Sequence, residues 1–129
     1  MTTLKVGIAE PDEMKARTMR IAKGEEKPAP GDPTVWFAST MSFAKFLSPS
    51  NCELLRIIHE REPDSLEELA QITGRAKSNL SRTLKAMAGY GLVRMEKGKG
   101  LKLVPKVIHD RVELVLPLIE RRKSKGTRK

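Results

Sequence analysis

Residues 75–93, RAKSNLSRTLKAMAGYGLV, predict a helix that ends in a glycine-rich turn and is followed by a strand. At about 100° per residue, this helix has one apolar side and one basic and polar side. The apolar side is formed by Ala76, Leu80, Thr83, Leu84 and Met87. The opposite side is formed by Arg75, Ser78, Arg82 and Lys85, with Asn79 and Ser81 on its flanks. Gly89 and Gly91 are expected to end the helix and turn the chain.

The segment before this helix predicts another short helix, LEELAQI at residues 66–72. Ser65 and Glu68 have the spacing of a capping box, in which each side chain accepts a hydrogen bond from the other residue's backbone NH. Thr73 and Gly74 end this helix, and the quoted helix follows almost at once. Two helices joined by so tight a turn predict a helix-turn-helix.

The segment after the quoted helix predicts a β-hairpin. In LVRMEKGKGLKLVP, residues 92–105, two alternating apolar runs flank a tip of lysines and glycines. Glycine supplies the positive φ that a tight reversal requires. Lys97 and Lys99 lie at this tip, where they serve either as solubilising charges or as contacts to phosphate; the flanking glycines favour phosphate contact.

The first third of the chain predicts a strand, a helix and a linker. Residues 4–8 alternate as in a half-buried strand, residues 11–23 form a helix, and three prolines in EEKPAPGDP, residues 25–33, favour an extended connector. From residue 34 we expect a short strand (TVWFAST), a short helix (MSFAKFLS), and a longer helix that begins at Ser48 and ends before Pro63.

A last strand is expected around residues 112–116, and it could pair with residues 4–8. The fold class predicted from these elements is α+β and mainly helical. Residues 1–33 would form an N-terminal strand-helix extension with its linker, and residues 34–120 the helix-turn-helix domain. Residues 121–129, with six basic and no acidic side chains, would form a disordered basic tail.

The charge of the chain favours polyanionic partners. At 129 residues it carries a formal net charge of +9, with a pI near 9.9. Within residues 65–103, eight basic residues stand against three acidic ones, so much of the excess lies on the predicted helix-turn-helix and hairpin. Nucleic acid is the first partner this distribution suggests, and acidic membrane surfaces the second.

Other classes of function have little support in the sequence. One cysteine and two distant histidines predict neither a disulfide framework nor a metal cluster, and no nucleophile–base pair or phosphate-binding loop suggests an enzyme or a cofactor. His59 with Glu60, Glu62 and Asp64 is interpreted as an exposed helix end. No apolar run predicts a signal peptide or a membrane span, and a cytoplasmic location is expected.

Aromatic side chains and the cysteine have two interpretations each. Trp36, Phe37, Phe43 and Phe46 could stack on single-stranded bases. Because aromatic residues make up only 4% of the chain, we expect them instead in the core or at a dimer contact. Cys52 could sense oxidants, but Glu53 beside it disfavours the thiolate, so a structural role is expected.

These motifs resemble a known group of proteins. The order of elements resembles the winged helix-turn-helix of prokaryotic regulators of the MarR and ArsR type: two helices, with the segment SNLSRTLKAMAGYGLV, and then a glycine-rich basic hairpin. More narrowly, KVGIAEPDEMKARTMRIA, DPTVWFAST and GRAKSNLSRTL are similar to short predicted transcriptional regulators of bacteria and archaea. The resemblance implies a dimer whose recognition helix is residues 75–88 and whose wing tip is residues 97–100. The N-terminal third departs from the MarR pattern, which leaves the mode of dimerisation open.

The hypothesis is therefore a sequence-specific, double-stranded DNA-binding repressor that acts as a homodimer. Predicted base contacts are Arg75, Asn79 and Arg82, and predicted phosphate contacts are Ser78, Ser81, Lys85, Lys97 and Lys99. Lys77 completes the predicted DNA-binding set. An alternative is an antitoxin that binds a small toxin protein and regulates its own operon, since the resemblance includes members encoded beside toxins. A third possibility is an RNA-binding module that uses the same basic surface.

Overall fold

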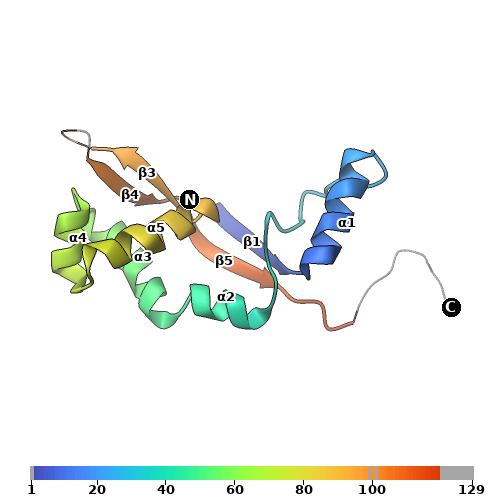
Figure 1. The fold of residues 1–129 in the computed structure, drawn as a ribbon, viewed down its shortest axis with the longest axis horizontal. Helices are drawn as coiled ribbons and strands as arrows, with labels where there is room; N and C mark the ends of the chain where they lie inside the picture. The colour runs from blue at the N-terminus through green and yellow to red at the C-terminus, as the bar shows by residue number, and fades with distance from the viewer. Residues whose placement is uncertain (1, 99, 101, 120–129) are drawn as a thin grey trace.

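The chain folds as an α+β protein, seen in a computed structural model that describes residues 2–98, 100 and 102–119. Within those residues it has five helices and two sheets (Figure 1). Most elements predicted from the sequence are present. In chain order they are β1 (Thr2–Ile8), α1 (Pro11–Ala22), β2 (Val35–Phe37), α2 (Thr40–Phe46), α3 (Pro49–Arg61), α4 (Leu66–Thr73), α5 (Lys77–Gly89), β3 (Val93–Lys97), β4 (Leu103–Val107) and β5 (His109–Val115).

One sheet pairs the first strand of the chain with the last one. Its strand order is β2-β1-β5, and both neighbours run parallel to the central strand β1. Val6 lies opposite Val35 on one side and Leu114 on the other, which confirms the expected pairing of the first and last strands. Alternate residues of a strand point to opposite faces, so Leu4 and Val6 share one face, where both are buried.

The helix starts and stops follow local signals. Ser48 caps α3 by accepting a hydrogen bond from the Asn51 NH at 3.2 Å. Ser65 caps α4 by accepting from the Glu68 NH at 3.0 Å. The second half of the predicted capping box was wrong, because the Glu68 carboxylate accepts from the Asp64 NH at 2.6 Å rather than from Ser65. The satisfied donor thus lies one residue earlier than predicted.

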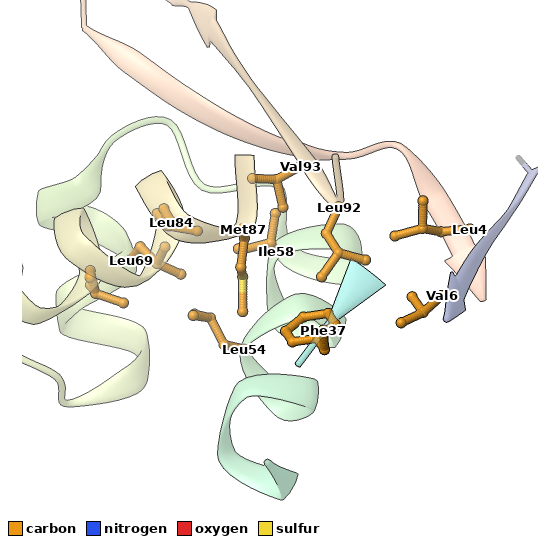
Figure 2. Packing of buried hydrophobic residues seen from close by; sticks show 11 residues of the cluster. Leu4, Val6, Phe37, Leu54, Ile58, Leu69, Leu84, Met87, Leu92 and Val93 are labelled. Carbon is orange, nitrogen blue, oxygen red and sulfur yellow. The ribbon is translucent and has the colours of Figure 1, made fainter. Parts of the chain in front are cut away.

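The core runs from the helices to the sheet without a break (Figure 2). Six side chains from α3, α4 and α5 are at most 2% exposed: Leu54, Ile58, Leu69, Leu80, Leu84 and Met87. Phe37 and Leu92 lie between this helical group and Leu4 and Val6 of β1, as Figure 2 shows. The sheet and the helices are therefore parts of one packed unit.

Aromatic side chains hold the middle of this core. Phe37 stacks on Tyr90 with ring centroids 4.5 Å apart and meets Phe43 edge-on at 5.5 Å. Phe46 packs against both Phe37 and Tyr90. The predicted core role is confirmed for the three phenylalanines. Trp36 instead points away from this core, on the opposite face of the strand from Phe37.

The antiparallel pair β3–β4 forms the predicted hairpin, with Val93 opposite Val107 and Lys97 opposite Leu103. In Figure 1 the hairpin, α4 and α5 gather at one end of the molecule, and α1 lies at the other end. In the described part of the chain, Ser78, Arg82 and Lys85 of α5 are exposed. The side of α5 that faces away from the core is consequently open.

Candidate nucleic-acid interface

The outer side of α5 carries a row of exposed polar and basic side chains. Ser78, Asn79, Ser81, Arg82 and Lys85 are all exposed, whereas Leu80, Leu84 and Met87 on the inner side are at most 1% exposed. This division confirms the two predicted sides for residues within the helix, whereas Ala76, predicted on the apolar side, is exposed and precedes the helix. We call these five exposed residues the α5 row. No acidic residue occurs in the helix, so the row presents donors and positive charge.

Arg75 lies outside this row, which corrects the predicted helix start. Ala76 is the N-cap of α5, with an extended backbone at φ −65° and ψ 143°, so Arg75 precedes the helix. Its guanidinium turns toward the start of α3 and donates to Ser50 Oγ at 2.6 Å and to Asn51 Oδ1 at 3.0 Å. Arg75 thereby ties the start of α5 to the start of α3.

Asn79, a member of the α5 row, also contacts Arg75. Its side-chain oxygen accepts a long hydrogen bond of 3.4 Å from Arg75 Nη1, while its amide nitrogen makes no hydrogen bond within the described residues. Asn51 is fixed in turn, because its amide donates to the Phe46 carbonyl at 2.8 Å. Sequence reasoning missed Ser50 and Asn51, since they precede Arg75 by more than 20 residues and carry no motif of their own.

Lys77, at the first turn of α5, is paired with Glu67 of α4. Its ammonium lies 2.6 Å from a Glu67 carboxylate oxygen, and both side chains are more than half exposed. The hydrogen bond from Lys77, helped by one from the backbone, lowers the pKa of Glu67 below its ordinary value. Glu67 is thus a carboxylate from a neighbouring helix that reaches the end of the α5 surface.

Arg82 and Lys85 differ from these two cations. Within the described part of the chain, neither makes a salt bridge or a side-chain hydrogen bond. Desolvating an unpaired cation beside a phosphate or a base edge breaks no existing bond in the protein. The charges best placed for an external anion are therefore those in the middle of α5.

The hairpin adds charge of both signs. Lys97, Lys102 and Lys106 border a hollow of about 470 Å³ that Asp64 and Glu96 also line. Arg94 pairs with Glu96 at 2.6 Å. The predicted contact Lys99 lies outside the described residues. Where the structure describes it, the hairpin is thus less uniformly basic than its sequence suggests.

Gly98 shows why the hairpin needs a small residue there. Its NH donates to the Lys102 carbonyl at 2.6 Å, which closes the reversal. A Cβ at this position would lie 2.7 Å from Val104 Cγ2, closer than carbon atoms pack. The glycine therefore lets the reversal sit directly against β4.

The described residues form neither a metal site nor a membrane-spanning helix. In the ranges that the structure describes, no three His, Cys, Asp or Glu side chains gather in a way that could hold a metal ion. Helices in those ranges are all too short or too polar to cross a bilayer. The prominent surface feature of this end of the molecule remains the α5 row.

The fold and this surface define an α+β protein that presents a basic, carboxylate-free helix from a packed helical core. Residues 46–114 match the model of the HVO_A0114 family, and the chain belongs to that family. The matched region runs from the end of α2 through α5 and the hairpin into β5. No curated protein matches the chain.

Proposed function

We propose that this chain is a sequence-specific, double-stranded DNA-binding transcriptional regulator that represses as a homodimer. The observation that carries the proposal is the α5 row, with the unpaired Arg82 and Lys85 at its centre. In this proposal, α3, α4, α5 and the β3–β4 hairpin act as a winged helix-turn-helix. The row lies opposite three of the most buried side chains in the protein, so a rigid base supports it.

The α5 row suits the major groove by its chemistry. Arg82 can donate two parallel hydrogen bonds to a guanine edge, and it is the main base reader in this proposal. Ser78, Ser81 and Lys85 supply phosphate contacts on either side of it. Lys97 on the hairpin and Lys99, two residues later in the sequence, would contact flanking phosphates.

Two predicted base contacts take changed roles in this proposal. Arg75 becomes a positioning residue, because its guanidinium is already held by Ser50 and Asn51. Asn79 shares its oxygen with Arg75 and contributes its amide NH₂ to an acceptor on a base. Lys77 contributes to phosphate binding only when it leaves Glu67.

A homodimer would place two α5 helices in successive major grooves, about 34 Å apart. Selection of duplex fragments from random-sequence DNA tests this arrangement. We expect enrichment of a two-fold symmetric site whose half-sites are separated by about 10 base pairs. Competition with duplex RNA at the same salt concentration should leave DNA binding nearly unchanged.

The matched variants are Arg82→Ala with Lys85→Ala in the row, and Lys15→Ala within α1 with Lys23→Ala at its C-cap. Both remove two exposed charges, but only the first pair touches the proposed groove contact. The row variant should enrich no symmetric site, and the α1 variant should enrich the wild-type site. Equal enrichment by both variants, or stronger binding to RNA than to DNA, would refute the proposal.

A further inference from the structure

The three-stranded sheet leaves one edge of β5 without a neighbour in the described residues, because β5 pairs only with β1. An open edge exposes backbone NH and carbonyl groups that can accept another strand. β5 has seven residues, long enough for such pairing, and neither proline nor a bulge interrupts its last five. This edge is thus an unsatisfied feature of the sheet.

An apolar hollow of about 630 Å³ lies beside the same strand. It opens between α3, the end of β4 and β5, and its apolar lining includes Leu55, Leu92, Val107, Val112 and Leu114. Arg111 and Val112, which are neighbours in the regular part of β5 and so point to opposite faces, both border it. The hollow therefore follows the edge of the strand rather than only one of its faces.

The residues that follow along the chain are apolar and uncovered. Leu114 is 37% exposed and Leu116 47%, and beyond them Leu118 and Ile119 are 92% and 81% exposed. An uncovered apolar run next to an unfilled apolar hollow indicates that the protein buries both in an assembly. Leu114 lines the hollow, and the residues after it continue past the end of β5, away from α3 (Figure 1).

We propose that a second copy of this chain pairs its β5 antiparallel with this β5, with Val112 on the two-fold axis, to form a continuous six-stranded sheet. The proposal deepens the proposed function by naming the interface of its homodimer, and it rests on that function only for the need of a dimer. A two-fold axis between like strand edges is the ordinary symmetry of such an interface. The partner strand would lie along the hollow.

The charges of β5 select this register. With Val112 on the axis, Arg111 lies opposite the partner's Glu113, and Glu113 opposite the partner's Arg111. Shifting the axis to position 111 or 113 would set two like charges against each other, which is unfavourable. A register between residues would join the apolar face of one copy to the polar face of the other.

The same register brings the two apolar features together. Because the two β5 strands would run antiparallel, the partner's chain after its Leu114 would run back along this β5 toward the end of β4. Val112 and Leu114 lie beside the buried Leu4 and Val6 of β1, so both are on the face of the sheet that is turned toward the helices. The partner's apolar run is therefore directed along the Val107 side of the hollow, and symmetry repeats the contact.

Sedimentation equilibrium of the full chain without DNA tests the interface. Wild type should be a dimer at micromolar concentration. Arg111→Glu and Glu113→Arg each turn two attractive cross-strand pairs into two repulsive ones, and each should weaken dimerisation by roughly ten-fold or more. The double variant exchanges the charges, restores both attractive pairs and should dimerise like wild type. Lys15→Glu in α1 is the matched charge-reversal control and should have no effect.

A mixture of the two single variants separates this contact from effects within one chain. Arg111 and Glu113 also form an ion pair 2.8 Å apart in the same strand, which each single variant destroys. Across the proposed interface, however, the two variants are complementary, so the mixture should form heterodimers with near wild-type affinity. Thermal unfolding of each variant shows whether it remains folded.

Three outcomes would overturn the proposed interface: a monomeric wild type, single variants that dimerise normally, or a mixture that does not associate. A monomeric wild type that captures another protein along this edge would assign the hollow to that protein instead. None of these results depends on DNA. Loss of DNA binding by an Arg82 variant that still dimerises would refute nothing here, and a dimer that binds no DNA would refute only the proposed function.

Discussion

The two ends of the molecule differ in how completely the chain covers its own apolar side chains. At the end formed by α3, α4 and α5, the inner residues are almost fully buried and the outer surface is polar. At the end formed by β1, β5 and α1, the helix α1 has no buried residue and the chain after β5 exposes leucines. The first end buries its apolar side chains within one chain, whereas the second leaves several of them exposed.

Leucine truncations at the two ends should give the largest contrast. Leu84→Ala removes a side chain that is 1% exposed, and we expect the free energy of unfolding to fall by about 2 to 5 kcal/mol. Leu118→Ala removes one that is 92% exposed, and the unfolding free energy at low protein concentration should change by less than about 0.5 kcal/mol. Urea unfolding measures both. Equal losses would show that the two ends are equally covered in the monomer.

A pair of glycine variants examines how tightly the sheet end is packed. A Cβ at Gly7 would lie 2.5 Å from the ring of Trp36, whose face also holds the Arg17 guanidinium 5.6 Å from its centre. Gly7→Ala should therefore cost about 1 to 3 kcal/mol of unfolding free energy. Gly89→Ala, where no atom lies within 4 Å of the added Cβ, should be neutral or stabilising by up to about 1 kcal/mol. A harmless Gly7→Ala would mean that Trp36 is loosely held.

Arg75→Ala tests whether Arg75 positions α5 or contacts a DNA base itself. Loss of the hydrogen bonds to Ser50 and Asn51 should lower the unfolding free energy by about 1 to 2 kcal/mol. DNA binding should weaken by the same factor on a selected site and on random duplex, because α5 as a whole is less well placed. A loss confined to the selected site, with stability unchanged, would make Arg75 a base reader as first predicted.

Glu67→Gln should have the smallest effect. It releases Lys77 from its partner, and one added phosphate contact would steepen the slope of log affinity for DNA against log salt concentration by about 0.9.

The pKa of Glu67 is lowered in the folded chain, so its pair with Lys77 stabilises the fold at pH values above the ordinary pKa of a glutamate. This stabilisation is lost as pH falls through the lowered pKa. NMR titration of Glu67 should show that this pKa rises toward its ordinary value in Lys77→Ala, while the backbone hydrogen bond still lowers it. An unchanged value would show that Lys77 does not make the pair in solution.

Most elements could be predicted because their signals are local. Ser48 and Pro49 start α3, Gly74 with φ of 77° ends α4, and the alternation of residues 4–8 and 112–116 marks two strands. Both strands were expected to pair, and they do. That β2 occupies the other side of β1, and that both pairs are parallel, depends on how the helices pack between strands, which no local pattern contains.

The candidate site was predicted in part for the same reason. The helical period placed Ser78, Arg82 and Lys85 on the outer side of α5, where the structure has them. The period could not place Arg75, because the helix begins only after an extended Ala76. Its partners on α3 are distant in sequence, so the anchor becomes visible only once the helices are packed.

The most direct measurement of the central claim compares the binding of wild type and Arg82→Ala to a selected duplex site and to random duplex at one salt concentration. If α5 reads DNA in the major groove, the variant should lose about 1 to 3 kcal/mol of binding free energy per half-site on the selected duplex and much less on random duplex. The ratio of the two affinities should therefore fall. Equal affinities of wild type and variant on both duplexes would contradict the account.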